Sequence, residues 1–351
     1  MRIDDLAASL GSWLSGGGPQ GDIAISARVR LARNLKGFHF LTHANDKDKR
    51  EIADRLREAI EAADLPGVSF LDITNLPALD RMLLVERHLI SKELAGGKGR
   101  RVVAFSAAED VSLMINEEDH LRIQVLKPGL ALAEAFRTAA DLDEKLEKKV
   151  DWAFSSQYGY LTACPTNLGT GLRASLMVHL PALVFMKQIE KVFQAVAKIN
   201  LAVRGLYGEG TQASGDFYQI SNQVTLGRKE EDLIEDLARV IPRIADYERR
   251  SRELWLKEDR TLLEDRVFRA LGVLQGARKI PSEETLDLLS AVRMGASLGL
   301  VRGVDLDRLN QLFLHSLPAH LQKRHGGEMP EADRDAARAR LVREALAGAS
   351  A

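Results

Sequence analysis

Apolar residues in the middle of the chain follow two different spacings, which predicts a mixture of strands and helices. Short apolar runs between polar residues predict four strands, at 102–105, 112–115, 123–126 and 201–203. Apolar residues at helical spacing predict one helix around Ile52, Leu56 and Ile60 and another from Leu183 to Val192. We therefore expect an α+β domain over residues 21–250, with an antiparallel sheet flanked by helices.

The beginning of the chain carries a helical pattern. Apolar residues recur there near the helical period, at Ile3, Leu6, Leu10, Trp13 and Leu14. Three glycines and a proline follow at 16–19 and end the pattern. We expect a short leader helix within residues 1–20.

The last third of the chain also has a helical pattern. After about residue 250, leucines recur at helical spacing among acidic and basic residues, and no strand pattern remains. Turn signals divide this region into several helices, of which Ser282 and Asp305 are the predicted N-caps. Residues 251–351 are therefore expected to form an all-helical domain.

Composition limits the classes of function. The chain has 351 residues, 45% of them hydrophobic, which is enough for two domains with a sizeable core. Lys+Arg 49 against Asp+Glu 50 gives a net charge of -1, which calls for neither nucleic acid nor an anionic membrane surface. A single cysteine excludes an intrachain disulfide and fits a reducing compartment. Without a signal-peptide pattern or a long apolar run, a cytoplasmic protein with no membrane span is expected.

The most distinctive segment runs from Cys164 to Ser175. It places the only cysteine on a rigid turn and Arg173 just after a glycine-rich loop. Glycines let backbone N–H groups approach an anion closely, and arginine offers a planar fork of donors that matches phosphate oxygens. Three further segments rich in groups that bind phosphate or guanidinium lie at 26–30, 116–122 and 204–209. This combination is typical of phosphoryl transfer.

In order and spacing, these four segments resemble the catalytic half of the guanidino kinases, the family of creatine and arginine kinases. The resemblance is closest to the bacterial branch that phosphorylates arginine in proteins, and it covers essentially the whole chain. It implies a guanidino-kinase catalytic domain followed by a helical domain. It also implies ATP as the phosphoryl donor, with Mg²⁺ carried by the nucleotide and no metal site on the protein.

The resemblance implies a nucleotide site built on five arginines, with His88 near the adenine. The residues that it assigns to ATP binding are Ser26, Ala27, Arg28, Val29, Arg30, His88, Arg122, Arg173, Ala174, Ser175, Leu176, Met177, Arg204, Gly205, Leu206, Tyr207, Gly208 and Glu209. The arginines repel one another when the site is empty, and a triphosphate relieves that repulsion.

Three residues match the acceptor side of the family's active site. A guanidinium nitrogen is a poor nucleophile until a carboxylate aligns it and helps to withdraw a proton. Glu118 and Glu209 match the two family glutamates that hold the guanidinium, and Cys164 matches the active-site cysteine. We expect Cys164 to orient charge as a thiolate near the same cation, without a phosphocysteine intermediate.

Two departures from the metabolite kinases predict a protein acceptor. Only a short leader precedes Ser26, so the separate helical domain that closes over a small substrate is expected to be absent. Tyr207 stands where metabolite kinases typically have arginine, as in the bacterial branch. The loop at 210–215, rich in small residues, is expected to close over the bound arginine.

A hexapeptide in the helical region matches that branch's motif for allosteric phosphoarginine binding: Arg334, Asp335, Ala336, Ala337, Arg338 and Ala339. Arg334 and Arg338 lie on one helical face, where like charges repel unless an anion sits between them. From the hexapeptide alone, an ordinary charged helix neutralised by Glu331 and Asp335 is favoured. The position of the motif in such a chain favours the phosphoarginine site.

The resemblance finally implies a cellular role. In this role phosphoarginine marks client proteins for a Clp ATPase and protease and relieves heat-shock repression. The implied partners are client proteins with exposed arginines, an McsA-like activator, a CtsR-like repressor and a second copy of the chain in a homodimer. Two alternatives stay open: a kinase for free arginine or another small guanidine, and a non-catalytic adaptor that binds phosphoarginine.

Overall fold

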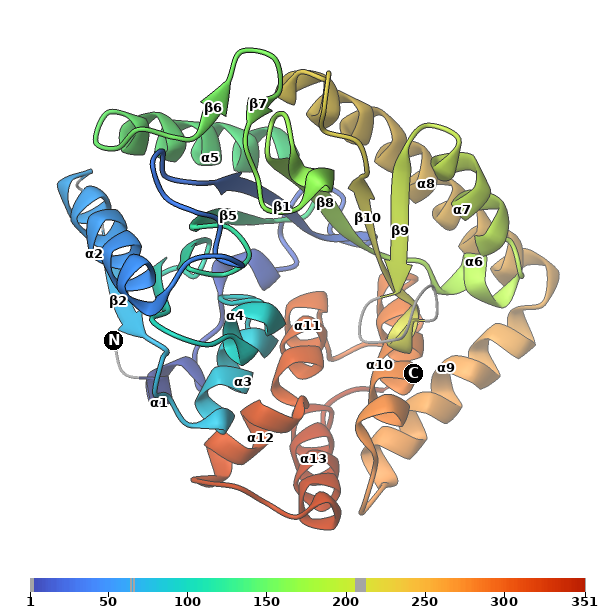
Figure 1. Cartoon of the computed structure of the whole chain (residues 1–351). Coiled ribbons are helices and arrows are strands. Elements are labelled where there is room, and N and C mark those ends of the chain that lie inside the picture. The colour runs from blue at the N-terminus through green and yellow to red at the C-terminus, as the bar shows by residue number, and fades with distance from the viewer. Residues whose placement is uncertain (1–2, 64, 66, 206–212, 351) are drawn as a thin grey trace.

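The computed structural model describes residues 3–63, 65, 67–205 and 213–350. Eight strands form one antiparallel sheet in the order β2-β3-β4-β5-β1-β8-β10-β9 (Figure 1). The strands are β1 (Ala24–Arg33), β2 (Val68–Asp72), β3 (Val102–Ser106), β4 (Val111–Ile115), β5 (Leu121–Pro128), β8 (Leu172–His179), β9 (Leu201–Gly205) and β10 (Phe217–Asn222). A separate hairpin pairs β6 (Phe154–Ser155) with β7 (Gly159–Tyr160).

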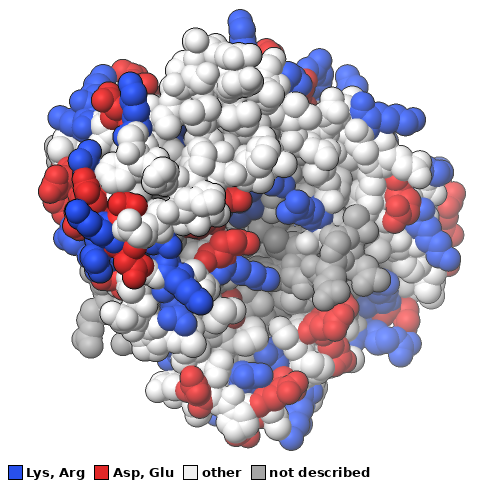
Figure 2. All heavy atoms as spheres, in the orientation of Figure 1, with Lys and Arg blue, Asp and Glu red and all other residues white. Residues whose placement is uncertain are grey.

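Strand β1, in the middle of the sheet, separates apolar from polar side chains. Ala27, Val29 and Leu31 are fully buried on one face, whereas Arg28 and Arg30 alternate with them and lie on the other. Strands β5 and β8 flank β1 and repeat the alternation. Figure 2 shows a hollow near the middle of the molecule, surrounded by side chains of both charges. One face of the sheet thus forms core, and the other is free for polar chemistry.

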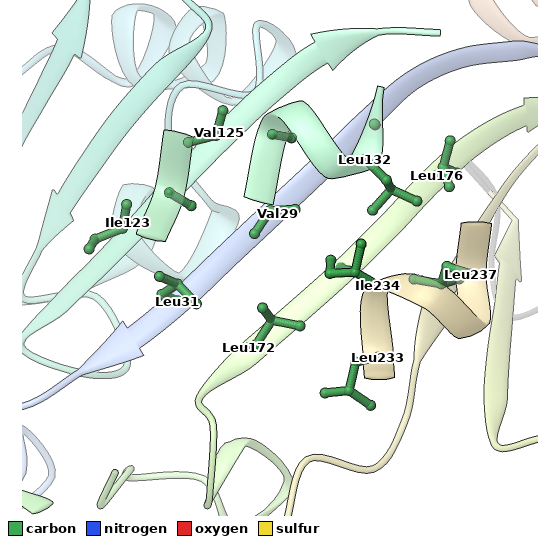
Figure 3. Close-up of a cluster of buried hydrophobic side chains, with 14 of the residues drawn as sticks. Val29, Leu31, Ile123, Val125, Leu132, Leu172, Leu176, Leu233, Ile234 and Leu237 are labelled. Atoms are coloured by element: carbon green, nitrogen blue, oxygen red, sulfur yellow. The ribbon is translucent and has the colours of Figure 1, made fainter. Parts of the chain in front are cut away.

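Helices cover the apolar face of the sheet. They are α2 (Asp46–Ala62), α5 (Leu132–Glu147), α7 (Ile189–Ala197) and the first half of α8 (Glu230–Glu258). Figure 3 shows Val29 and Leu176 of the sheet among Leu132 of α5 and Ile234 of α8. Burial of these side chains is the main stabilising contribution to this half of the molecule.

A smaller core lies on the opposite face, against the outer strands. Helices α1 (Ile3–Leu6), α3 (Ala78–Glu86) and α4 (Lys92–Gly96) pack there. Val103 and Phe105 of β3 contribute to this core together with Leu83 and Leu94 of the helices. These helices therefore cover the polar face only on the side of β2, β3 and β4.

The last part of the described chain is helical and forms a core of its own. It contains α9 (Arg260–Gly276), α10 (Ser282–Ser297), α11 (Leu306–His315), α12 (Pro318–His325) and α13 (Glu331–Ala345), and α6 (Pro181–Phe185) packs beside them. Helix α8 runs through residue 250 and reaches both cores, with Leu237 in the first and Trp255 in the second.

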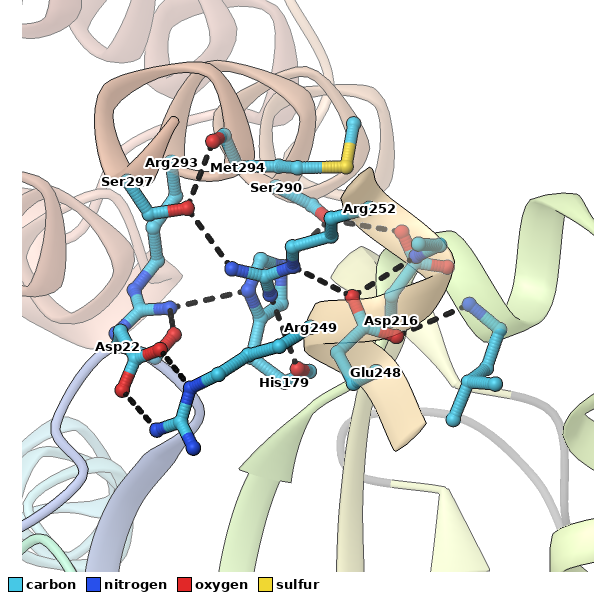
Figure 4. A network of polar contacts seen from close by, with 12 residues as sticks. Asp22, His179, Asp216, Glu248, Arg249, Arg252, Ser290, Arg293, Met294 and Ser297 are labelled. Carbon is cyan, nitrogen blue, oxygen red and sulfur yellow. Dashed lines mark hydrogen bonds and ion pairs between the residues drawn. The ribbon is translucent and has the colours of Figure 1, made fainter. Parts of the chain in front are cut away.

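A buried polar network joins the sheet to the helices (Figure 4). Glu248 of α8 accepts hydrogen bonds from the first N–H groups of α6 and forms an ion pair of 2.7 Å with Arg252. His179, at the end of β8, lies 2.8 Å from Ser290 Oγ through Nε2 and 3.0 Å from Arg293 through Nδ1. Burial, with the charges of Arg293 and Arg252, holds the pKa of His179 well below its ordinary value. The histidine is therefore neutral in this joint.

The predicted fold class is confirmed: an α+β domain with an antiparallel sheet precedes a helical region. The four predicted strands correspond to β3, β4, β5 and β9, and the first predicted helix to α2. The helix expected from Leu183 to Val192 is two helices, α6 and α7. No helix of the described residues is long and apolar enough to cross a bilayer.

The leader helix is present but shorter than its apolar pattern, and one predicted N-cap was wrong. The leader is a short helix and a separate 3-10 turn (Ser12–Leu14), because Arg87 binds Ser9 O and Ala108 O accepts from Ser12 N, which holds the chain extended between them. Ser282 is already inside α10, since Pro281 has the extended backbone of the N-cap position. Asp305 is a confirmed N-cap and accepts from Arg308 N at 2.7 Å.

Candidate active site

The five arginines predicted to bind phosphate lie on the polar face of the sheet. Strand register places Arg30 opposite Arg173, Arg122 opposite Ala32, and Arg204 opposite Gln219. Directly opposed residues of antiparallel strands point to the same side. Sequence-distant arginines therefore converge because of strand pairing alone.

Within the described residues Arg28, Arg30 and Arg173 form no ion pair, whereas Arg122 pairs with Glu117 at 2.5 Å and with Glu118 at 3.2 Å. Arg28 donates to Gln219 Oε1 at 2.6 Å, and its burial and the charges of Arg173 and Arg122 lower its pKa to about 10. The pKa values of Arg30 and Arg173 are also lowered, first by burial and then by neighbouring arginines. The Nε atoms of Arg30 and Arg173 are buried without a hydrogen-bond acceptor. Buried donors of this kind are costly, so the site is built to receive an anion.

A cavity of about 190 Å³ brings the acceptor-side residues to these arginines. Its lining residues are Arg30, Ala32, Glu118, Arg122, Cys164, Thr166, Asn167, Gly171 and Arg173. Glu118 lies 3.2 Å from Arg122 and is 41% exposed, so it can exchange that partner for a cation that enters the cavity. Burial raises the pKa of Glu118. Arg122 acts in the opposite direction, and the neighbouring carboxylates raise the pKa further.

Backbone contacts hold Cys164 in this cavity. It precedes a 3-10 turn (Pro165–Asn167) that begins with proline. The N–H of Ala163 donates to Asp119 Oδ1 at 2.7 Å, which ties the cysteine loop to the turn that carries Glu118. Cys164 Sγ lies 3.0 Å from Thr166 Oγ1. The loop is therefore positioned before any substrate enters.

The end of this loop requires glycine. Gly171 has φ +66, and a Cβ there would meet Ala32 O at 2.6 Å. Its N–H donates to Asn167 O at 2.9 Å, so the loop closes tightly before β8 begins.

A narrower cavity of about 20 Å³ continues along the polar face. It is lined by Ser26, Arg28, His88, Leu126, Ser175, Met177 and Gln219. His88 is held edge-on to Trp13, with ring centroids 5.1 Å apart. Burial and the charges of Arg28 and Arg30 lower its pKa to about 3, so it is neutral. This end of the site is the less polar one, since Leu126 and Met177 line it.

The structure separates the other predicted ATP-site residues into two groups. Ala27, Val29, Ala174 and Leu176 point into the core, so only their backbones are available to a ligand. Gly205 ends β9. The predicted residues Leu206, Tyr207, Gly208 and Glu209, and the first part of the expected closing loop at 210–212, lie outside the described residues.

Sequence patterns missed several polar residues of the site. Glu117 is buried and contacts Arg122 at 2.5 Å and Ser91 Oγ at 2.5 Å. Gln219 holds Arg28 from β10. Glu117 is adjacent to Glu118 in the sequence, but its inward direction depends on the turn, and nothing in the sequence around Gln219 signals its role.

The phosphoarginine motif lies on α13, and its two arginines differ. Arg338 is only 1% exposed and donates to Ser316 O, Ile280 O and Asp335 Oδ1. Arg334 is half-buried and has one long hydrogen bond to Met329 O, at 3.4 Å. Asp335 neutralises Arg338 at i,i+3, as expected for an ordinary charged helix. Arg338 is thus a structural residue whatever else it binds.

Cations with unsatisfied donors lie beside a carboxylate and a thiol in one cavity, an arrangement compatible with a phosphotransferase. Comparison with known proteins agrees. The model of the ATP:guanido phosphotransferase C-terminal catalytic domain matches residues 51–251, and that of the protein-arginine kinase McsB C-terminal domain matches residues 260–351. The chain belongs to the ATP:guanido phosphotransferases and, among them, to the protein-arginine kinases, and it is an enzyme.

Relatives and solved structures support this assignment. The protein-arginine kinase of Moorella thermoacetica is 50% identical over 96% of this chain and 97% of its own length, and that of Bacillus subtilis is 43% identical over 96% and 94%. Among solved structures, the taurocyamine kinase of Schistosoma mansoni with bound transition-state analogue components has a TM-score of 0.59 and 28% identity, covering 71% of this chain and 36% of that one. Lombricine kinase has a TM-score of 0.57 and 25% identity, and the match covers 71% of this chain and 70% of that one.

Proposed function

We propose that this enzyme is an ATP-dependent protein arginine kinase, which transfers the γ-phosphoryl group of Mg-ATP to arginine side chains of proteins. The observation that carries the proposal is the cavity in which Arg30, Arg122 and Arg173 meet Glu118 and Cys164. It offers positive charge for the triphosphate and, on the same walls, groups that can hold a guanidinium. Family membership and the names of the relatives support ATP as donor and a protein arginine as acceptor.

The arginines supply the electrostatic part of catalysis. Arg28, Arg30, Arg122, Arg173 and Arg204 would bind the triphosphate, and the adenine would lie toward His88. Burial, and then repulsion from neighbouring arginines, lowers the pKa values of Arg28, Arg30 and Arg173. The phosphates, and the charge that spreads in the transition state, would relieve that repulsion. We propose that Mg²⁺ enters on the triphosphate, where it would neutralise charge on the transferred group. No three His, Cys, Asp or Glu side chains converge within the described residues, and we assign none as a metal ligand.

The acceptor side would prepare one guanidinium nitrogen for attack. Glu118 would accept hydrogen bonds from the substrate guanidinium, align the nitrogen with the γ-phosphorus and take its proton as the N–P bond forms and the bond to ADP breaks. Cys164 would lie beside the same cation, in the cavity that it shares with Arg173. Glu209, outside the described residues, is proposed as the second carboxylate.

The wider role rests on the family. We propose that phosphoarginine marks client proteins for a Clp ATPase and protease and relieves heat-shock repression, with McsA-like and CtsR-like partners, in the cytoplasm. A catalytic domain over 21–250, a helical domain over 251–351 that forms the homodimer, and an allosteric phosphoarginine site at 334–339 complete the proposal. The half-buried Arg334 supports that site, since it retains donors for an anion.

Mass spectrometry of an intact, unfolded, arginine-containing protein tests the function. The purified chain is incubated with Mg-ATP and this protein under non-acidic conditions, and a parallel reaction contains free arginine. Acid-labile additions of phosphoryl groups that map to arginine are expected. Transfer to free arginine alone would instead make this a kinase for a small guanidine, and no transfer to either acceptor would contradict the proposal.

A further inference from the structure

A second groove adjoins the acceptor cavity on the far side of Glu118. It has a volume of about 270 Å³ and shares Glu118 with that cavity. Its other walls include Lys49, Lys98, Asn116 and Glu117, and the Glu117 carboxylate is already paired with Arg122 at 2.5 Å. None of the phosphate-binding arginines lines it. A polypeptide whose arginine side chain reaches Glu118 therefore has this groove beside it, away from the nucleotide.

The two lysines of the groove form no ion pair with any residue that the structure describes. Among the described residues, no carboxylate lies within ion-pair distance of Lys49 or Lys98, and Asp46, one turn earlier on α2, is also beyond that distance. The neighbouring Arg100 forms an ion pair with Asp72. Positive charge in the groove is thus available to a ligand.

One buried amide fixes the geometry of the groove. Asn116 Nδ2 donates to Lys49 O of α2 and to Arg100 O, just after Lys98, both at 2.8 Å. These two bonds determine which way the amide points, because the reverse orientation would place its oxygen against two carbonyls. Its Oδ1 is consequently left buried without a donor. The walls that carry the lysines are therefore held in a fixed arrangement around an unused acceptor.

We propose that this groove binds the client polypeptide next to the target arginine and prefers an acidic residue there. The inference rests on the proposed protein kinase function and names the substrate sequence that the site favours. A carboxylate in the groove would pair with Lys49 and Lys98. Because an extended chain advances about 3.3 Å per residue, the acidic residue lies within about two or three positions of the arginine.

Three synthetic peptides with one arginine each test the preference. They carry Glu, Gln or Lys at the flanking positions and are otherwise identical, and kcat/KM is measured for each with Mg-ATP. The intact chain is expected to favour the Glu peptide over the Gln peptide by about fivefold, the size typical of partly exposed ion pairs. The difference should appear in KM, since the groove does not touch the transferred group.

Lysine variants separate the groove from general charge effects. In the double variant Lys49→Gln/Lys98→Gln the Glu-to-Gln ratio should fall to about one, and Lys98→Glu should favour the Lys peptide. Lys47→Gln removes one positive charge on the exposed side of α2, outside the groove, and should keep the ratio of the intact chain. Unchanged melting temperatures confirm that the variants fold.

The outcomes distinguish this proposal from the function on which it rests. If the ratio of kcat/KM for the Glu and Gln peptides is the same in the intact chain and in the double variant, the groove is not a specificity site. The kinase function is unaffected by that result. Absence of transfer to all three peptides and to an unfolded protein overturns both.

Discussion

Arg30 and Arg173 are directly opposed across strands β1 and β8, and the Nε atoms of both guanidinium groups are buried without an acceptor. Like charges in opposed positions destabilise a sheet, and buried unpaired donors add to that cost. The sheet therefore stores an unfavourable interaction at the point where the triphosphate is proposed to bind.

Replacing one member of this pair should separate stability from activity. Arg173→Met keeps much of the side-chain volume and removes a repelling charge, so we expect the free energy of unfolding to stay the same or rise by about 1 kcal/mol. Arginine transfer should fall by about a thousandfold or more. Urea unfolding and the phosphoryl-transfer assay check the two effects. A clear loss of stability would contradict the view that Arg173 is strained in the empty site.

Glu118 should affect turnover far more than nucleotide binding. Glu118→Gln keeps the shape but cannot take a proton, so we expect kcat to fall by about 10²- to 10⁴-fold while the Kd of ATP changes little. Glu93→Gln is the matched control, because Glu93 is an exposed carboxylate whose charge acts on Glu118. Single-turnover kinetics and calorimetric ATP titration measure the two quantities. Equal losses in both variants would argue against a role for Glu118 as the base.

The two arginines of α13 should behave differently. Arg338→Ala leaves the carbonyls of Ser316 and Ile280 and the carboxylate of Asp335 without a donor, so we expect a loss of about 3 kcal/mol in the free energy of unfolding. Arg334→Ala should cost less than about 0.5 kcal/mol and is the better probe of phosphoarginine binding. Chemical denaturation of both variants, with phosphoarginine added in a second series, makes the comparison. A stable Arg338→Ala protein would contradict the structural role.

Stability should fall in mild acid. Burial and neighbouring cations lower the pKa values of His88 and His320 to about 3 and that of His315 to about 4, from an ordinary 6.5. Between its lowered pKa and pH 6.5, each histidine takes up a proton only on unfolding. Its contribution to the free energy of unfolding is therefore complete above pH 6.5 and is lost as the pH falls toward the lowered pKa. Burial raises the pKa of Glu86 to about 7, from an ordinary 4.5. This carboxyl group therefore stabilises the fold in acid, and its contribution to the free energy of unfolding is lost as the pH rises toward 7.

The three histidines outweigh the one carboxyl group. We expect the free energy of unfolding to fall by up to about 1.4 kcal/mol per pH unit for each histidine below pH 6.5, less the contribution of Glu86. Urea midpoints at pH of about 7.5, 6.5 and 5.5 test this. A constant midpoint over that range would show that these histidines are not held neutral.

The sequence predicts those parts of the fold that depend on local pattern. The apolar runs of β3, β4 and β5 and the helical spacing of α2 are visible because each element buries one face. Strand β1 has no comparable run, since it alternates buried apolar residues with Arg28 and Arg30. The spacing of these two arginines is the signal that a strand presents both on one side.

The arrangement of the site depends on contacts between distant segments and is less visible. Nothing local shows that Arg30 lies opposite Arg173, because strand register decides it. Arg338 has the sequence context of an exposed helical residue, yet the loop before α10 and the turn before α12 bury it. Resemblance to a family supplies such residues as a set, but the structure is needed to distinguish the ones that support the fold.

Helix α8 couples the stability of the sheet region to that of the helical region. The helix is continuous from Glu230 to Glu258, and its two ends are anchored in different cores. If either core unfolded, one end of this helix would lose its tertiary contacts. A helix without tertiary contacts is only marginally stable in water. The sheet region and the helical region should therefore unfold as one cooperative unit. A ligand that binds to either region should raise the free energy of unfolding of the whole chain.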